Sequence, residues 1–201
     1  MSGRDDRIEA TLAARLGSVV VVAEAVRRRH NVSAILRSCE AFGVHEVHLV
    51  TAGFRPVPGA SRAAERWVDL QVRPTTAASL DELKARGFAV WVADFLPDAR
   101  TPETVPVDRP LALVFGSEVR GVSPEARARA DGAVVIPMVG LTRSLNVSVS
   151  AAILIRAVAE RRRAIVGADL DPAARARFAA EWRARDEAHR RGILARTADD
   201  G

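Results

Sequence analysis

Three segments of the chain combine hydrogen-bonding side chains with glycine or small residues, as ligand sites do. The longest is IPMVGLTRSLNVSVSAAILI (136–155), which breaks at Pro137 and Gly140 before a run of small and β-branched residues. A strand-to-helix connection needs only a few residues. The apolar side chains could wall a flat group while Ser144 and Asn146 bond its polar edges, the composition of pockets for adenine-bearing cofactors. The alternative, an elaborate helix cap, explains Ser144 or Asn146 but not the whole stretch.

The second segment, FGSEVRG (115–121), superficially resembles a dinucleotide-binding loop. Such a loop needs its second glycine where the pyrophosphate comes close. Glu118 stands at that place, and its carboxylate would repel phosphate. The segment therefore suits a neutral or cationic ligand better. The alternative is a plain turn with a solvated acid.

The third segment, RRRHNVSAILR (27–37), predicts a helix that begins with Asn31 as its N-cap. Arg37 then lies about a turn and a half inside an otherwise apolar helix, where a charge needs a partner or a function. An ion pair, for instance with Glu40, is one explanation. Chemistry on a ligand is the other. Cys39 on the same helix is interpreted as a core residue, because nothing nearby would activate it.

The sequence between and around these segments predicts strands that alternate with helices. Near-continuous apolar runs predict strands at 18–23, 46–50, 67–72, 88–93, 111–116 and 133–136. Helices are predicted at 4–16, 31–43, 79–87, 123–130, 146–165 and beyond 172, with Gly43 just past one end, Ser123 as a cap, and a Gly/Pro loop after residue 50. This order indicates an α/β fold with a mostly parallel sheet covered by helices on both faces. In such sheets ligands bind beyond the carboxyl ends of the strands, where all three segments fall.

The excess of positive charge lies at the two ends of the chain. The net charge of +5 arises from residues 1–30 and 156–201, around a neutral middle. Basic ends indicate a polyanion partner, with arginine suited to forked contacts on phosphate; solvated helix faces are the alternative. Phe178 and Trp182 share one face of the predicted Arg-rich C-terminal helix, which follows a linker at 167–172.

Several classes of protein are disfavoured. The chain has no apolar run of membrane-spanning length and no apolar stretch near its start, so we expect neither a membrane span nor a secretory signal. A single cysteine fits a reducing compartment, which predicts a cytoplasmic protein. His45 and His48 fall on opposite faces of a strand, so we expect no metal site there.

Taken together, HNVSAILRSCEAFGVHEVHLV, LVFGSEVRGVSPEA and IPMVGLTRSLNVSVSAAILI resemble the three motifs of the SpoU/TrmH family of RNA ribose 2′-O-methyltransferases. The resemblance covers roughly residues 27–160, with the motifs in order and at normal spacing. It implies a trefoil knot near the C-terminal end of the α/β domain, which the segment 136–146 would thread. It also implies S-adenosylmethionine as cofactor and a homodimer whose active site forms at the subunit interface.

The resemblance assigns roles to individual residues. The catalytic positions would be Arg37, Asn31, Glu118, Ser144 and Asn146, with Arg37 acting either as a base or electrostatically on the ribose 2′-hydroxyl. The cofactor contacts would be Ala93, Gly116, Ile136, Met138 and Leu145, of which Ala93 is matched by strand position alone. From the charge pattern, RNA contacts are expected at Arg28, His30, Arg161, Arg162 and Arg163.

The predicted organisation is an N-terminal helical extension (1–17), a knotted methyltransferase domain (18–165) and a basic C-terminal helical extension (166–201). Short basic helices around the domain resemble family members that methylate guanosine-18 in the tRNA D-loop. Methylation of another RNA, such as 23S rRNA or the tRNA wobble position, remains an alternative, as does a non-catalytic RNA-binding homologue. With 4% aromatic residues and no tyrosine, we expect recognition through phosphates and RNA shape rather than base stacking.

Overall fold

The computed structural model describes residues 3–51 and 66–199, in which six strands form one sheet. Every strand pair is parallel, in the order β3-β2-β1-β5-β4-β6, which confirms the predicted parallel α/β fold. The strands are β1 (Leu16–Glu24), β2 (Val44–Val50), β3 (Asp69–Arg73), β4 (Ala89–Ala93), β5 (Leu111–Phe115) and β6 (Gly132–Val134). The predicted Gly/Pro loop lies largely at 52–65, outside the described residues.

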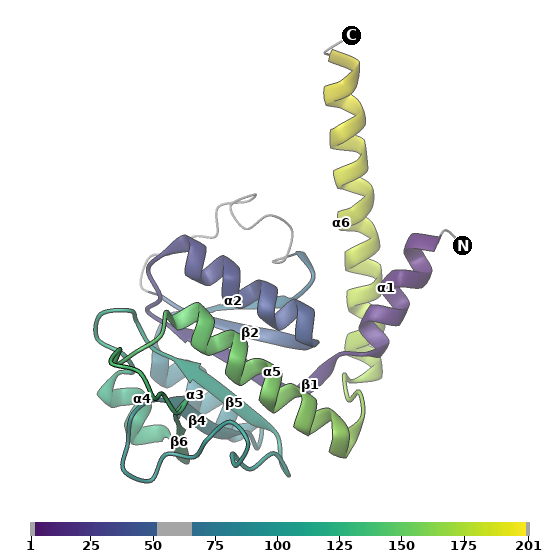
Figure 1. The fold of residues 1–201 in the computed structure, drawn as a ribbon. Helices are drawn as coiled ribbons and strands as arrows, with labels where there is room; N and C mark the ends of the chain where they lie inside the picture. Colours follow the sequence, from purple (N-terminus) through teal and green to yellow (C-terminus); the bar gives the residue numbers. More distant parts are fainter. Residues whose placement is uncertain (1–2, 52–65, 200–201) are drawn as a thin grey trace.

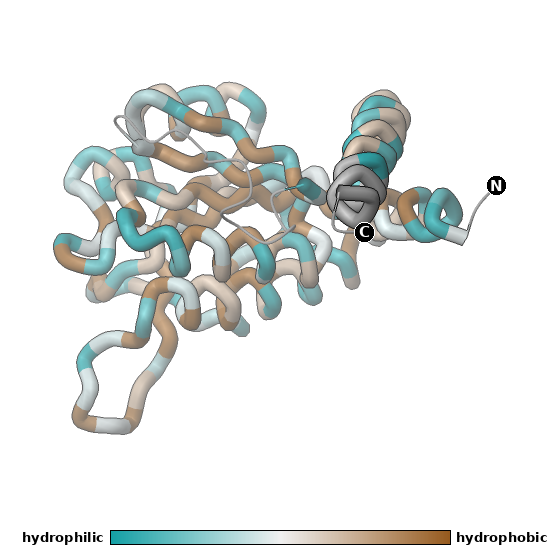
Figure 2. The backbone as a smooth tube through the Cα atoms, turned by 90° about the horizontal axis from the view of Figure 1, so that it is seen from above, coloured by the Kyte–Doolittle hydropathy of each residue, from teal (hydrophilic) through white to brown (hydrophobic). Residues whose placement is uncertain are grey.

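Helices cover both faces of the sheet because successive strand residues point to opposite sides. Val19 and Val21 of β1 belong to the core beneath α2 (Arg29–Phe42) and α5 (Val147–Val166) (Figure 1). Val20 and Val22 pack on the other side. That second core is closed by α3 (Thr76–Ala85) and α4 (Pro124–Arg129). The central strands are thus apolar on both faces. In Figure 2 the middle of the α/β unit is accordingly coloured largely brown, for hydrophobic residues.

Some helix ends follow the sequence signals and others do not. The helix predicted at 4–16 ends at Ala13, and the helix predicted from residue 79 begins at Thr76. Gly43 ends α2 in the left-handed conformation with φ +79°, and the Ser123 hydroxyl accepts a hydrogen bond from the Ala126 amide at the start of α4, as predicted. The prediction that Asn31 caps α2 is wrong. Arg28 occupies the cap position without a side-chain hydrogen bond, and Asn31 lies inside the first turn.

The terminal helices pack against each other. Residues of α1 (Gly3–Ala13) and α6 (Pro172–Asp199) form a separate small core. Phe178 and Trp182 share its buried face, as predicted. The ring of His45, at the start of β2, meets Phe178 edge-on with 4.2 Å between the ring centroids. Figures 1 and 2 show α1 and α6 side by side at the end of the sheet where β1 begins, with α6 rising away from the α/β unit.

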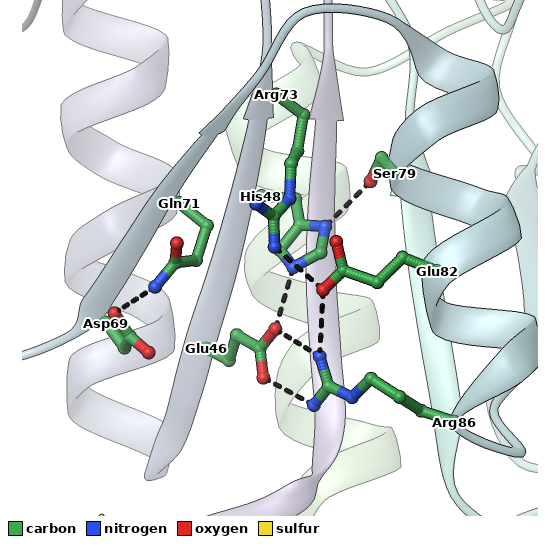
Figure 3. A network of polar contacts seen from close by, with 8 residues as sticks. All are labelled: Glu46, His48, Asp69, Gln71, Arg73, Ser79, Glu82 and Arg86. Atoms are coloured by element: carbon green, nitrogen blue, oxygen red, sulfur yellow. Dashed lines mark hydrogen bonds and ion pairs between the residues drawn. The ribbon is translucent and has the colours of Figure 1, made fainter.

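A polar network joins β2 to α3 (Figure 3). The Glu46 carboxylate accepts two hydrogen bonds from Arg86 and one from His48, each at 2.7 Å. Burial alone would raise the pKa of Glu46, but the hydrogen bonds from Arg86 and His48 lower it to about 2. Glu82 lies near these groups and pairs with Arg73 at 2.7 Å. Because both carboxylates already bond a guanidinium group, we interpret the network as structural.

No helix among the described residues is long and apolar enough to cross a membrane.

Candidate active site

A pocket of about 550 Å³ opens at the carboxyl ends of β4, β5 and β6, and we call it the cofactor pocket. The loop after β4, the turn after β5 and the segment 134–147 that leads into α5 contribute its walls. All five residues predicted to contact the cofactor line it, namely Ala93, Gly116, Ile136, Met138 and Leu145. The structure therefore brings together positions that are up to 52 residues apart in the sequence.

Gly116 is required by the close approach of two backbone segments. Ser117 and Gly121 exchange backbone hydrogen bonds that close the turn after β5, at 3.0 and 2.9 Å. A Cβ atom on Gly116 would lie 2.1 Å from the Gly121 carbonyl group. Any side chain there would force the turn open, so glycine fixes the shape of this wall of the cofactor pocket.

A chain of side-chain hydrogen bonds connects three of the predicted catalytic residues. The Asn31 amide donates to the Glu118 carboxylate at 2.7 Å and accepts from the Asn146 amide at 3.2 Å. The Asn146 carbonyl oxygen in turn accepts from the backbone amide of Ser148 at 2.8 Å, which makes Asn146 the N-cap of α5. Asn31 is 1% exposed, so its amide can only be satisfied within the protein. The chain therefore fixes the starts of α2 and α5 against the turn after β5.

Glu118 is held as a carboxylate. Burial would raise its pKa, but hydrogen bonds from Asn31 and from backbone amides, including those of Arg27 and Arg28, keep that pKa below its ordinary value. At neutral pH it is ionised and accepts hydrogen bonds only. A carboxylate in this position favours a cationic group in the cofactor pocket over a phosphate.

Arg37 is not among the residues that line the cofactor pocket. Its side chain is exposed on α2 and forms no hydrogen bond or ion pair with the described residues. Glu40, considered above as its partner, instead lies 3.5 Å from Arg15. Cys39, predicted to be a core residue, is buried, and this burial raises the pKa of its thiol to about 12. Ser144 does line the cofactor pocket, together with Glu118 and Asn146.

The predicted RNA contacts differ in how accessible they are. Arg28 lines the cofactor pocket, and His30 is exposed at the start of α2. The prediction for Arg162 is wrong, because its side chain is buried and donates to the Ser18 hydroxyl at 2.9 Å and the Val107 carbonyl at 3.0 Å. Arg161 and Arg163 are half-buried and also donate to backbone carbonyls, of Val105 at 2.7 Å and Phe42 at 2.8 Å. These three arginines therefore hold α5 in place.

The arginines of α6 are largely paired within the chain. Arg175 and Arg183 pair with Glu9 of α1, and Arg4 of α1 pairs with Asp186. Further pairs lie within α6, namely Arg177–Glu181, Arg185–Glu181 and Arg191–Glu187. The expected excess of free positive charge on this helix is thus reduced by acids of α1 and of α6 itself.

Sequence reasoning missed several residues of the cofactor pocket, among them Asp94, Phe95 and Ser117. Asp94 directly follows β4 and accepts a hydrogen bond from Arg127 at 2.5 Å. Its place beyond the carboxyl end of a parallel strand is the signal that could have identified it.

The residues present fit S-adenosylmethionine. The volume lies within the range of about 300–1,000 Å³ usual for small-molecule pockets. Ile136, Met138 and Leu145 offer apolar surface for a flat ring. The ionised Glu118 offers negative charge to a ligand that carries a sulfonium and an ammonium group. This combination of apolar side chains with one carboxylate favours a cationic nucleoside over a dinucleotide.

The chain is similar in sequence and in fold to known proteins. The model of the SpoU rRNA Methylase family matches residues 18–156. The tRNA (guanosine(18)-2'-O)-methyltransferase of Thermus thermophilus is 42% identical over 185 residues, 89% of this chain and 95% of that protein. The enzyme of the same name from Escherichia coli K12 is 38% identical over 151 residues, 74% of this chain and 66% of that protein. The crystal structure of the A. aeolicus TrmH/SpoU tRNA modifying enzyme matches with a TM-score of 0.81 and 31% identity, covering 91% of this chain and 96% of that one.

Proposed function

The chain belongs to the SpoU rRNA Methylase family, and from this premise we propose that it transfers a methyl group to the ribose 2′-hydroxyl of guanosine-18 in tRNA. The observation that carries the proposal is the convergence of the three sequence motifs on one pocket with the Asn31–Glu118–Asn146 chain beside it. The tRNA substrate and the guanosine are supported by the relatives, whose names specify them.

We propose S-adenosylmethionine as the methyl donor. Ile136, Met138 and Leu145 would hold its adenine ring. The turn after Gly116 would form another wall of the same site. When bound, its sulfonium group supplies an already activated methyl group. The protein is therefore required mainly to position the acceptor hydroxyl, to exclude water and to assist the loss of the hydroxyl proton.

Glu118, Asn31 and Asn146 act by positioning. Their hydrogen bonds fix the starts of α2 and α5 at the cofactor pocket, and the ionised Glu118 remains an acceptor at neutral pH. Arg37 carries the catalytic role. Because an arginine side chain keeps its positive charge at neutral pH, it is suited to stabilise the negative charge that develops on the ribose oxygen.

A homodimer would complete the site. Arg37 is exposed and outside the cofactor pocket of its own chain, so a second copy that places it at a neighbouring pocket would explain its position. Val139 and Leu141 are fully exposed, and Val149 and Ile153 on α5 are 46% and 39% exposed. These apolar groups are suited to contact that second copy. Sedimentation should then give twice the chain mass of 21.6 kDa.

We further propose that residues 136–146 are threaded in a trefoil knot, as the family resemblance implies. This would explain why a connection between β6 and α5 is long and rich in both leucine and polar residues. The knot would hold the apolar wall of the cofactor pocket in a fixed shape.

The test is a map of ribose methylation in RNA from cells that lack this protein. We expect the methyl group at guanosine-18 of tRNA to disappear and other ribose methylations to remain. Loss of a methyl group from 23S rRNA or from the wobble position would assign a different substrate. An unchanged map would support a non-catalytic RNA-binding role.

A further inference from the structure

A second hollow of about 440 Å³ adjoins the cofactor pocket, and we call it the side pocket. It lies at the carboxyl ends of β1 and β2, next to the starts of α3 and α4. Ser117 and Gly121 line both hollows, so the turn 117–121 forms their common wall. The proposed methyl transfer gives the side pocket no role. An RNA that places a ribose in the cofactor pocket has neighbouring nucleotides, which need a binding surface beside that pocket.

The acids of the side pocket are already satisfied. Glu24 is 5% exposed and accepts hydrogen bonds from the hydroxyls of Thr76 and Ser123 at 2.5 Å each, and from the Ser123 amide at 2.9 Å. Its carboxylate thereby ties the end of β1 to the starts of α3 and α4. Glu125, the other acid of the pocket, lies 3.9 Å from the Arg129 guanidinium group.

The basic groups of the side pocket have no side-chain partner in the described part of the chain. Arg27 and Arg120 line this pocket, both are exposed, and neither side chain forms a hydrogen bond or ion pair with the described residues. Their backbones are nevertheless fixed. The Arg27 amide donates to Glu118 at 3.4 Å, and the Arg120 amide donates to the Ser117 hydroxyl at 3.1 Å. Two unpaired guanidinium groups are therefore held beside the site by a defined backbone.

This arrangement contrasts with that of the basic ends of the chain. The α6 arginines described above are paired with acids, and α1 and α6 lie at the opposite, amino-terminal end of the strands. Positive charge that is both unpaired and close to the cofactor pocket is therefore found at Arg27, Arg28 and Arg120. Guanidinium groups bind phosphate in a forked geometry, and free ones do so without first breaking an internal ion pair.

Resting on the proposed function, we propose that the side pocket holds a nucleotide of the RNA that neighbours the methylated one, with its phosphate bound between Arg27 and Arg120. The shared wall 117–121 would then lie between that nucleotide and the methylated ribose. The two arginines would set the position of the RNA backbone relative to the cofactor pocket. Contacts of this kind fix register without reading the base.

The test combines protein and RNA substitutions. Transcripts of a tRNA with guanosine at position 18 would be assembled with single neutral methylphosphonate linkages, placed in turn at each position within two nucleotides of guanosine-18. Their affinities would be measured for the wild type, for the double variant Arg27→Gln/Arg120→Gln and for Arg109→Gln. Arg109 is a matched control because it is also exposed and has no partner among the described residues, but it precedes the amino end of β5.

We expect the double variant to bind the unmodified transcript more weakly, with a salt dependence shallower by about 0.7–0.9 for each phosphate that the protein no longer neutralises. One methylphosphonate linkage should weaken binding to the wild type and to Arg109→Gln but have little additional effect on the double variant, which already lacks the partner of that phosphate. Equal losses of affinity in all three proteins at every linkage would overturn the side-pocket assignment. The control for an intact fold is the affinity for S-adenosylmethionine, which we expect to be the same in the double variant as in the wild type.

The two proposals fail in different ways. Methylation of guanosine-18 by the wild type with no coupling at any linkage would remove the side-pocket proposal alone. Coupling at one linkage with no methyl transfer would retain the phosphate site and remove the proposed function. Tight binding of free inorganic phosphate that competes with no RNA would identify a small-anion site and overturn the nucleotide assignment.

Discussion

The side-chain amide of Asn31 lies 2.7 Å from the carboxylate of Glu118, although the two residues are 87 positions apart in the sequence. This bond connects the first turn of α2 to the turn after β5, and Asn146 extends the connection to α5. Each of the three sequence motifs contributes one of these residues. Hydrogen bonds therefore connect the three motifs directly to one another.

Replacing Asn31 with alanine should weaken that connection. The half-buried Glu118 and the exposed Asn146 would each lose a hydrogen-bond partner. Because one of the two lost bonds is to a charged carboxylate, we expect the free energy of unfolding to fall by about 1–3 kcal/mol. Affinity for S-adenosylmethionine should also fall, because the turn 117–121 loses a support. Urea unfolding and calorimetry measure the two effects. Ser38→Ala is the control, since its hydroxyl donates to the Ala34 carbonyl within α2 and to no other group that the structure describes. Equal effects of both changes would contradict a special role for Asn31.

Leu145 tests the wall of the cofactor pocket. A glutamate there would place a charge against the adenine ring, so Leu145→Glu should abolish detectable binding of S-adenosylmethionine in calorimetry. The matched control is Ile165→Glu, which makes the same change at an exposed residue near the end of α5, away from the pocket lining. Wild-type affinity in a folded Leu145→Glu protein would rule out the proposed location of the adenine ring.

Arg37 tests catalysis against binding. Because its contact is argued to form in the transition state, Arg37→Ala should lower the single-turnover rate at saturating tRNA by on the order of a hundredfold. Affinities for tRNA and cofactor should change little. Arg109→Ala removes an equally exposed arginine and should leave the rate unchanged. If Arg37→Ala raised the tRNA dissociation constant while keeping the saturated rate, Arg37 would belong to the binding surface instead.

The burial of His45 between α6 and the sheet should make the free energy of unfolding depend on pH. Burial and then the nearby charge of Arg15 lower the pKa of His45 to about 4, and neither ring nitrogen has a hydrogen-bond partner among the described residues. The unfolded state, with a pKa near 6.5, binds the proton more readily. Stability should therefore fall as pH drops from 6.5 towards 4, by at most about 3 kcal/mol.

The measurement is urea unfolding followed by tryptophan fluorescence at several pH values, since Trp182 packs near His45. His45→Leu should flatten the curve between pH 6.5 and 4 and leave the loss of stability at lower pH, where Glu46 becomes protonated. A variant with the slope of the wild type would show that another group titrates in this window.

Much of the sheet could be predicted from the sequence because its strands are buried on both faces. β1 and β5 read as continuous apolar runs, and a single glycine marks the end of α2. The cofactor pocket could be located because the motifs follow strands at their carboxyl ends, where a parallel sheet gathers its loops. These signals are local in the chain.

The errors concern side chains whose partners are distant in the sequence. Asn31 resembles a helix cap, but its amide is used by Glu118 and Asn146. Arg162 is one of three consecutive arginines that read as a basic patch, yet its partner Ser18 lies 144 residues earlier. The arginines of α6 read as free charge because the acids of α1 that pair with them come from the other end of the chain. Spacing alone contains no information on such contacts.

The most direct test of the central claim uses purified protein, S-adenosylmethionine and two tRNA transcripts that differ only in the sugar of residue 18. Mass spectrometry of nuclease fragments would locate the methyl group. We predict one 2′-O-methyl group at guanosine-18 of the ordinary transcript and none on the transcript with 2′-deoxyguanosine at that position. Methyl transfer to the 2′-deoxyguanosine transcript, or to any other residue of the ordinary one, would contradict the proposed function.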